Sequence, residues 1–226
     1  MALDIPRIQA LCFDVDGTLR DTDDQYVRLL ADALRPAHPL FPRQDLERLA
    51  RRLVMAVETP GTFLFGLTDR LEIDRLLAVL SDNLARLRKA SRSHPHPMIN
   101  GTRELLAELS GRYPLAIVSS RGERSTLSFL AEHELERYFQ VVVSAQTCRH
   151  TKPFPEPLIY AAARMGVPPQ SCLMVGDTTV DIRAGRLAGA QTVGVLCGFG
   201  ELDELVREGA DLILDTTPYL QSQLVL

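Results

Sequence analysis

The chain has 226 residues, of which 46% are hydrophobic and 24% are charged, as in an ordinary globular protein. The net charge of −4 gives no basic footprint for nucleic acid, and no apolar run approaches the ~18 residues of a membrane span. The first residues, MALDIPRIQALCF, lack the layout of a signal peptide, and the four cysteines form no C-x-x-C pair. We therefore expect buried free thiols and a cytoplasmic protein that binds neither nucleic acid nor membrane.

An apolar run at residues 8–13 predicts a buried strand, and this strand ends at two carboxylates. These are Asp14 and Asp16, and a turn follows at once with Gly17 and Thr18. Like charges beside a hydrophobic strand are costly unless a positive group lies between them. The sequence therefore predicts a positive group at this strand end.

Residues 19 to about 90 contain no convincing strand, and their apolar positions recur at helical spacing, as in RLEIDRLLAVLSDNLARL at residues 70–87. This stretch is too long for a crossover, so it indicates a helical insertion after the first strand. The proline-rich segment SHPHPMING, at residues 93–101, ends it. We predict a core domain of residues 1–18 and 92–226 and a helical cap domain of residues 19–91.

The remaining sequence alternates strands and helices. Further buried strands are predicted at residues 115–118, 141–143, 172–175, 192–195 and 212–214, with helices at 125–133, 157–165 and 179–188. Strands separated by helices of this length imply right-handed crossovers and a parallel sheet covered on both faces. The expected fold class is α/β, with a doubly wound, Rossmann-like core.

Chemically reactive side chains follow four of the strands. Ser119, Ser120 and Arg121 come after the strand at 115–118, and Lys152 lies in TKPFPEP, some way past the strand at 141–143. Asp177 and Asp181 come from GDTTVD, after the strand at 172–175. Because ligands of open parallel sheets bind outside the carboxyl ends of the strands, we expect these groups to converge.

The residue types favour phosphate chemistry with a hard metal ion. Clustered carboxylates without histidine or cysteine at ligand spacing prefer Mg²⁺ to Zn²⁺, and Mg²⁺ commonly adds a substrate phosphate to one or two carboxylates. A lysine and a hydroxyl nearby suit phosphate oxygens. An aspartate can itself be the nucleophile and form an aspartyl-phosphate that is later hydrolysed.

Four segments, FDVDGTL, the VSS strand end, TKPFPEP and VGDTTVDI, resemble in order and spacing the four motifs of the haloacid dehalogenase-like hydrolase superfamily. The resemblance covers residues 8 to about 195, and the helical insertion looks like the cap of that superfamily. The tail, AGAQTVGVLCGFG with ELVREGADLILDTTPYL, is similar to the phosphoglycolate phosphatase-like branch.

The resemblance implies a role for each matching residue. Asp14 would be the nucleophile and a Mg²⁺ ligand, and Asp16 the general acid and base that gives the metal its backbone carbonyl. Asp177 would complete the metal shell, with Asp181 close behind it, and Lys152 would also steady Asp14. The phosphate-binding set would be Gly17, Thr18, Ser119, Ser120 and Lys152. Relatives often have Asn where this chain has Ser120 followed by Arg121, so Arg121 is expected to add a charge contact of its own.

These roles predict a Mg²⁺-dependent phosphatase for a small phosphorylated metabolite, a phosphoric monoester such as phosphoglycolate. Asp16 argues against dehalogenase activity, and a cap whose one lysine is Lys89 argues against phosphonate cleavage. A phosphomutase resembling β-phosphoglucomutase shares every core motif and stays open, as does a non-catalytic phosphometabolite-binding protein. The sequence sets neither the leaving group nor the oligomeric state.

Two other segments allow more than one interpretation. Gly198-Phe199-Gly200 hints at a dinucleotide loop, but the third glycine is missing and we expect a surface loop. The segment at residues 59–69 is either a specificity loop or a turn between helices. Asp14 does not open a calcium loop, because Leu19 and Gln25 occupy the positions where Gly and Glu are required.

Overall fold

The computed structural model describes residues 3–21 and 97–224. These residues belong to one compact unit, Met1–Thr22 with Pro97–Leu226. Most of the predicted helical cap, with the segment at residues 59–69 and Lys89, lies outside the described residues. The domain boundaries at residues 18/19 and 91/92 therefore stay a prediction.

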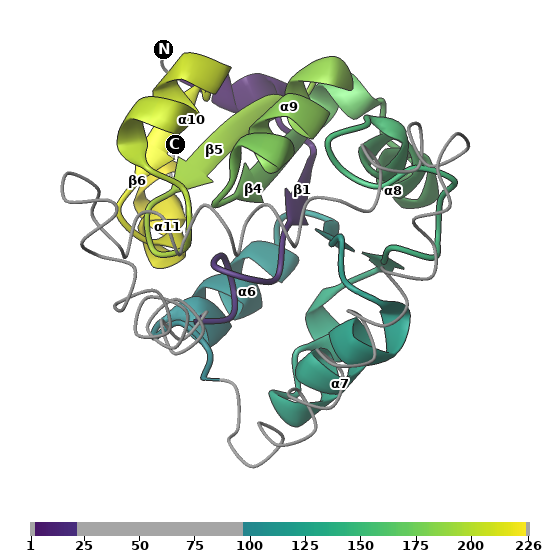
Figure 1. Cartoon of the computed structure of the whole chain (residues 1–226). Coiled ribbons are helices and arrows are strands. Elements are labelled where there is room, and N and C mark those ends of the chain that lie inside the picture. Colours follow the sequence, from purple (N-terminus) through teal and green to yellow (C-terminus); the bar gives the residue numbers. More distant parts are fainter. Residues whose placement is uncertain (1–2, 22–96, 225–226) are drawn as a thin grey trace, which may run out of the picture. The chain divides into compact units, whose positions relative to one another are not determined.

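Six strands form one parallel sheet, as the sequence predicts (Figure 1). They follow the order β3-β2-β1-β4-β5-β6. The direction of winding changes at β1, because the chain first builds β2 and β3 on one side and then returns to place β4 on the other. The strands are β1 (Ala10–Phe13), β2 (Leu115–Val118), β3 (Val141–Val143), β4 (Cys172–Gly176), β5 (Gln191–Val195) and β6 (Leu212–Leu214).

The three helices expected between the later strands are confirmed, each with slightly shifted ends: α7 (Glu123–Glu132), α8 (Glu156–Met165) and α9 (Thr179–Leu187). Additional helices are α6 (Thr102–Ser110), α10 (Leu202–Glu208) and α11 (Leu220–Gln223). Short 3-10 segments occupy η1 (Ile5–Arg7), η3 (Glu136–Tyr138), η4 (Pro169–Ser171) and η5 (Thr217–Tyr219). None of the helices in the described ranges has the length and apolar character needed to cross a membrane.

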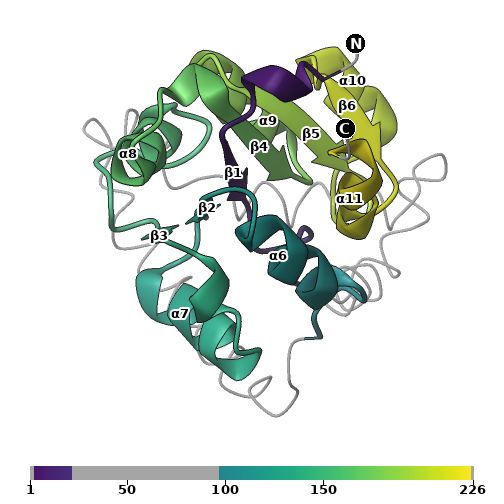
Figure 2. The same ribbon diagram turned by 180° about the vertical axis from the view of Figure 1, so that it is seen from behind.

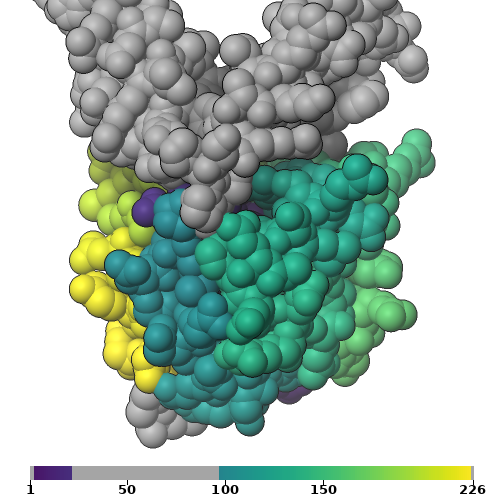
Figure 3. Space-filling view, turned by 90° about the horizontal axis from the view of Figure 1, so that it is seen from below, coloured from purple at the N-terminus to yellow at the C-terminus, as the bar shows by residue number. Residues whose placement is uncertain are grey.

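Helices cover both faces of the sheet, which confirms the doubly wound architecture (Figure 2). Alternate residues of a strand point to opposite faces, so Leu11 and Phe13 pack with α6, α7 and α11, whereas Ala10 and Cys12 pack with α8. All four of these strand side chains are fully buried. On the outside, α6 and α7 form adjoining parts of the molecular surface (Figure 3).

The chain leaves and re-enters the core through a short pair of antiparallel segments. The backbone N–H of Asp21 donates to the carbonyl of Pro97 at 2.8 Å, and the N–H of Ile99 donates to the carbonyl of Leu19 at 3.0 Å. Arg20 lies between these bonds and pairs with Met98. The link therefore begins four residues after Asp16, directly beside the turn that carries Gly17 and Thr18.

All four cysteines are free, as expected. Cys12 and Cys172 are buried in the sheet, but Cys148 and Cys197 are half-buried, so the expectation of burial holds for two of them. Cys148 and Cys197 lie in loops, whose sequences have no apolar periodicity from which burial could be predicted.

Candidate active site

The predicted site residues do converge at the carboxyl ends of the strands. Asp14 continues the β1 ladder, since its N–H donates to the carbonyl of Val175 at 2.9 Å. Ser119 continues β2 in the same way, with a bond of 2.9 Å to Val143. Asp177 directly follows β4. The sheet itself thus fixes the spacing of three site residues that are far apart in sequence.

Lys152 is the centre of the site. Its ammonium Nζ lies 2.7 Å from Asp14 Oδ1 and 2.6 Å from Asp181 Oδ1. The lysine side chain is only 2% exposed, so both ion pairs lie in a poorly solvated environment where they are far stronger than at the surface. The positive group that the first strand end requires is therefore partly a side chain of the protein itself.

Asp177 is enclosed by glycines. It is fully buried, and its Oδ2 accepts the backbone N–H of Phe199 at 2.7 Å. A Cβ added at Gly17 or Gly198 would overlap the Asp177 carboxylate, and one at Gly200 would overlap its backbone carbonyl. The expectation of a surface loop at residues 198–200 is therefore wrong: Phe199 and Gly200 are buried, and the loop packs against Asp177.

Asp181 uses both carboxylate oxygens within the protein. Besides Lys152 on Oδ1, its Oδ2 accepts the backbone N–H of Thr178 at 3.0 Å and the Thr178 hydroxyl at 2.6 Å. It thereby caps the first turn of α9. Gly176 is required beside it, because an added Cβ would overlap the Asp181 side chain.

The turn after Asp16 is held by residues from the C-terminal part of the chain. The hydroxyl of Thr217 donates to the carbonyl of Thr18 at 2.6 Å, and the thiol of Cys197 donates to the carbonyl of Gly17 at 3.3 Å. Thr18 is fully buried, and its own hydroxyl has no hydrogen-bond partner among the described residues. Gly17 has φ +71°, a conformation that favours glycine.

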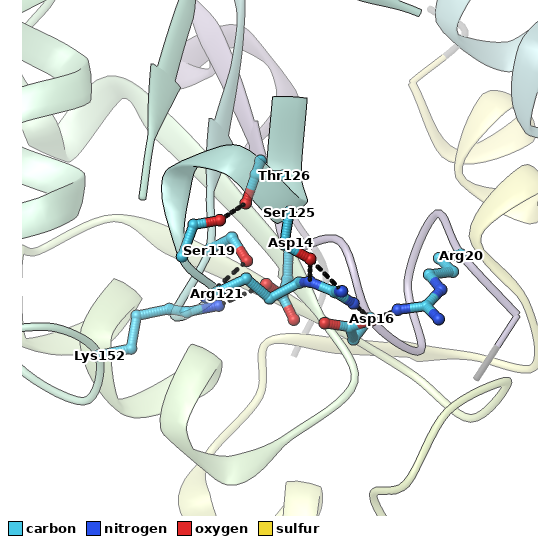
Figure 4. A network of polar contacts seen from close by, with 9 residues as sticks. Asp14, Asp16, Arg20, Ser119, Arg121, Ser125, Thr126 and Lys152 are labelled. Atoms are coloured by element: carbon cyan, nitrogen blue, oxygen red, sulfur yellow. Dashed lines mark hydrogen bonds and ion pairs between the residues drawn. The ribbon is translucent and has the colours of Figure 1, made fainter. Parts of the chain in front are cut away.

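The carboxylate of Asp16 lies between two arginines (Figure 4). Its Oδ1 lies 2.5 Å from Nη1 of Arg121 and 2.9 Å from Nη1 of Arg20, which approach from opposite sides. The sequence analysis singled out Arg121 but not Arg20. A cation four residues after an aspartate is so common that its contact with the site was not evident from sequence.

The loop after β2 separates the two serines. Ser119 is buried, and its hydroxyl accepts the backbone N–H of Arg121 at 3.2 Å. Ser120, by contrast, is exposed. Arg121 is held at its other end by Ser125 on α7, which accepts from both Nε, at 3.1 Å, and Nη2. The structure thus brings Ser119 to the site and gives Arg121 a fixed place there.

Burial makes the carboxylates expensive to ionise. It raises the pKa of Asp14 to about 7, assisted by Asp181 and Asp16 and opposed by Lys152. Burial also raises the pKa of Asp177, with Asp181 and Asp14 adding to the effect. For Lys152, desolvation is outweighed by Asp14 and Asp181, so its pKa is raised and the ammonium form is retained. The negative charge of the ionised carboxylates would therefore exceed the single positive charge of Lys152.

The carboxylates could hold a metal ion. Oxygens of Asp14, Asp177 and Asp181 lie within 4.8 Å of one another. Asp177 Oδ1 is buried without a hydrogen-bond partner among the described residues, which is the observation that best fits a cation-binding role. Asp181 is already saturated, so Asp14 and Asp177 are the better direct ligands. The donors are all oxygens, which suits a hard divalent ion.

Comparison with known proteins agrees with this geometry. A sequence model described as "Haloacid dehalogenase-like hydrolase" matches residues 11–195. A phosphoglycolate phosphatase of Nitrosococcus oceani is 30% identical over 220 residues, covering 92% of each chain. An N-acetylmuramic acid 6-phosphate phosphatase of Pseudomonas aeruginosa is 30% identical over 212 residues, covering 92% of this chain and 91% of the relative. In the crystal structure of a Pseudomonas syringae hydrolase, the TM-score is 0.73 at 26% identity, with 95% of this chain and 96% of that chain covered.

The glycine enclosure of Asp177 leads to a prediction about metal affinity. Gly198→Ala places a methyl group on the carboxylate, while its backbone conformation requires no positive φ, so displacement of Asp177 is the direct consequence. We expect binding of Mn²⁺, measured by calorimetry, to weaken about tenfold or more, the scale seen when groups that orient a metal ligand are changed. Gly111→Ala is the matched control, because the nearest atom to its added Cβ is 3.4 Å away. Gly111 is also far from Asp177 in the sequence. Equal Mn²⁺ affinity in Gly198→Ala and Gly111→Ala would contradict the positioning role.

The raised pKa values lead to a prediction about stability without metal. The pKa of Asp14 is raised to about 7 and that of Asp177 is raised above its ordinary 3.8, so the folded state holds protons on both groups at pH values where the unfolded chain has released them. The stability that this contributes is full below 3.8 and is lost as the pH rises through the raised pKa values of the folded state. Asp177→Asn removes one of these groups, so in excess chelator its unfolding free energy should fall less steeply between pH 4.5 and 7.5 than that of the unaltered protein. Urea denaturation at each pH measures this, and parallel curves would show that Asp177 is not a source of the effect.

Proposed function

The chain belongs to the haloacid dehalogenase-like hydrolase family and is a phosphatase of that family, and we propose that it hydrolyses a small phosphate monoester, with Mg²⁺, through an aspartyl-phosphate on Asp14. One observation carries the proposal: a buried lysine bridges the carboxylate that follows β1 and a carboxylate of α9, beside a third carboxylate with an oxygen that has no hydrogen-bond partner in the described part of the chain. A purely structural cluster would not leave a buried carboxylate oxygen without a partner.

Asp14 is suited to attack phosphorus. Lys152 engages Oδ1 of Asp14, which favours the ionised carboxylate and leaves its other oxygen outside that ion pair. Lys152 has three N–H donors, and the contacts seen in the described residues use two, so one donor is left for a phosphoryl oxygen. In the first step an Asp14 oxygen bonds to phosphorus while the bond to the leaving-group oxygen breaks, and Asp16 gives that oxygen a proton.

The second step returns the enzyme to its starting state. Water attacks the phosphorus of the aspartyl-phosphate, the bond to the Asp14 oxygen breaks, and Asp16 takes the proton of the water. Inorganic phosphate leaves. Both arginines contact Oδ1 of Asp16, so its Oδ2 lies outside these ion pairs and can handle the proton in both steps. Ser119, buried at the end of β2, adds a hydroxyl that can hold the phosphoryl group.

Residues for the metal are Asp14, Asp177 and the backbone carbonyl of Asp16, with Asp181 behind them. When bound, Mg²⁺ would offset the charge repulsion between a carboxylate nucleophile and a phosphate dianion. The Asp16 carboxylate is already paired with Arg20 and Arg121. This agrees with Asp16 offering the metal its backbone carbonyl rather than its side chain. The glycines around Asp177 would keep its carboxylate in place whether or not the metal is bound.

The substrate class follows from the relatives and from the tail of the sequence. Both curated relatives named above are phosphatases of phosphate esters that carry a carboxylic acid, glycolate in one and N-acetylmuramic acid in the other. Their identity to this chain is the same, so they support a carboxylated monoester more strongly than either single compound. We propose phosphoglycolate as the first compound to test, because a small leaving group fits the phosphoglycolate phosphatase-like tail.

The metal requirement gives the first test of the function. Purified protein should release inorganic phosphate from 4-nitrophenyl phosphate with Mg²⁺, lose this activity in excess chelator and regain it when Mg²⁺ is restored. Among natural esters, loss of 2-phosphoglycolate should match the phosphate released. Full activity in chelator would contradict the metal role, and rapid interconversion of sugar phosphates with slow phosphate release would indicate a phosphomutase instead.

Substitutions of the two aspartates of the first motif should have different effects on the reaction. Asp14→Asn should abolish turnover and the covalent phosphoryl-enzyme, because an amide is not a nucleophile. Asp16→Asn should still form the phosphoryl-enzyme but slow turnover by about 10²–10⁴-fold, the usual range of acid–base catalysis. Acid-quenched mass spectrometry detects the intermediate, and Asp21→Asn, an exposed neighbour, serves as the matched control. Substantial turnover in Asp14→Asn would show that the nucleophile has been misassigned.

A further inference from the structure

We propose that Arg121 binds the carboxylate of the leaving group and so determines the specificity for carboxylated phosphate esters; this inference rests on the proposed phosphatase function. The sequence assigns the loop after β2 to phosphate binding through its serines. The structure gives Arg121 a different place, at the Asp16 carboxylate, which it approaches from the side opposite to Arg20 (Figure 4).

The position of Arg121 relative to the reacting atoms is the first argument. A general acid must lie within hydrogen-bond reach of the leaving-group oxygen, about 3 Å. Arg121 Nη1 lies 2.5 Å from Asp16 Oδ1, which places the guanidinium within about 6 Å of that oxygen. A carboxylate two bonds away from the leaving-group oxygen, as in glycolate, falls inside this range. The phosphoryl oxygens, by contrast, are the natural partners of Lys152.

The unused donors of Arg121 are the second argument. A guanidinium has five N–H donors. In the part of the chain that the structure describes, Asp16 takes one from Nη1, and Ser125 takes one from Nε and one from Nη2. One N–H therefore remains on each terminal nitrogen. These two donors are available to a substrate carboxylate, so Arg121 can bind one without releasing Asp16.

The third argument is the solvent exposure of the Arg121 side chain and the contacts that hold it in place. The Arg121 side chain is 25% exposed, whereas its partner on the other side of Asp16, Arg20, is 9% exposed. Arg121 is thus the one of the two that a ligand can reach, and Arg20 serves to fix Asp16 from behind. The contacts with Ser125 hold the guanidinium in one orientation before substrate arrives, which lowers the entropy lost on binding.

The charge of the site provides the fourth argument. Lys152 is already shared between Asp14 and Asp181, so a carboxylate arriving with the phosphate would find no free positive charge there. Such a group would be repelled from the Asp14 side by the buried carboxylates. Arg121 supplies a cation beside Asp16, where the carboxylate of a carboxylated ester can be accommodated.

The experiment compares two substrates that differ only in the group that Arg121 is proposed to bind. These are 2-phosphoglycolate and 2-phosphoglycolamide, in which a neutral amide replaces the carboxylate. The readout is the ratio of their kcat/KM values with Mg²⁺. Any effect of a variant on Asp16 or on phosphoryl transfer lowers both values and cancels in the ratio.

Arg121→Gln should lower this ratio about 10- to 100-fold, the range for losing a charge-assisted, two-pronged contact. Arg20→Gln should lower both kcat/KM values while leaving the ratio unchanged, because Arg20 contacts Asp16 from the buried side. Arg124→Gln, on the exposed surface of the same helix that carries Ser125, should change neither value. Ser125→Ala, an exposed and conservative change, should lower the ratio about fivefold by releasing the guanidinium, and it tests the inference should Arg121→Gln not fold.

An unchanged ratio in folded Arg121→Gln and in Ser125→Ala would overturn the inference, as would an unaltered protein that prefers the amide. Either result leaves the phosphatase function intact, because phosphate release from the amide or from 4-nitrophenyl phosphate still demonstrates it. Failure of the proposed function has a different signature, namely no phosphate release from any of these esters in the unaltered protein.

Discussion

The ion pairs of buried Lys152 are the interaction on which the rest of the site depends. Three buried carboxylates meet where β1, β4 and α9 come together, and such a concentration of negative charge would oppose folding without a cation among them. Lys152 supplies that cation by bridging Asp14 and Asp181. Among the residues that the structure describes, Oδ1 of the buried Asp177 carboxylate has no hydrogen-bond partner. The protein thus carries a deficit of positive charge at the point where a divalent ion would be used.

The surrounding backbone is shaped by this cluster. Glycine at positions 17, 198 and 200 lets two loop segments approach Asp177, and glycine at 176 lets β4 approach Asp181. Thr217 and Cys197 then hold the carbonyls of the turn after Asp16. Loops after β1 and β5 and the segment after β6 are in this way all fitted to the same few side chains. Such fitting places the carboxylates before any ligand arrives, which is how a preorganised site avoids reorganisation during the reaction.

Much of the fold and part of the site could be predicted from the sequence. The strands are short apolar runs bounded by polar turns, and three of the six have the predicted ends at residues 115–118, 141–143 and 212–214. Because parallel strands end at one edge, the meeting of Asp14, Lys152, Asp177 and Asp181 followed from the order of the elements alone. The contacts that sequence could not give join residues about 105 to 199 positions apart, as in Arg121 with Asp16 and Thr217 with Thr18. Such contacts depend on side-chain direction rather than on pattern, which is also why the role of Gly198 and Gly200 was missed.

Under the proposed function, two groups of residues carry two separate tasks. On one side, Lys152 and the buried aspartates can recognise only phosphate and metal, since nothing there distinguishes one leaving group from another. On the other side, Asp16 is tied to Arg121, so the group that handles the leaving-group proton is fixed to a cation that can bind a neighbouring carboxylate. Because the ion pair joins the two functions in space, a substrate whose carboxylate is bound by Arg121 has its leaving-group oxygen brought to Asp16. Binding energy from a part of the substrate that does not react would then be used to orient the part that does.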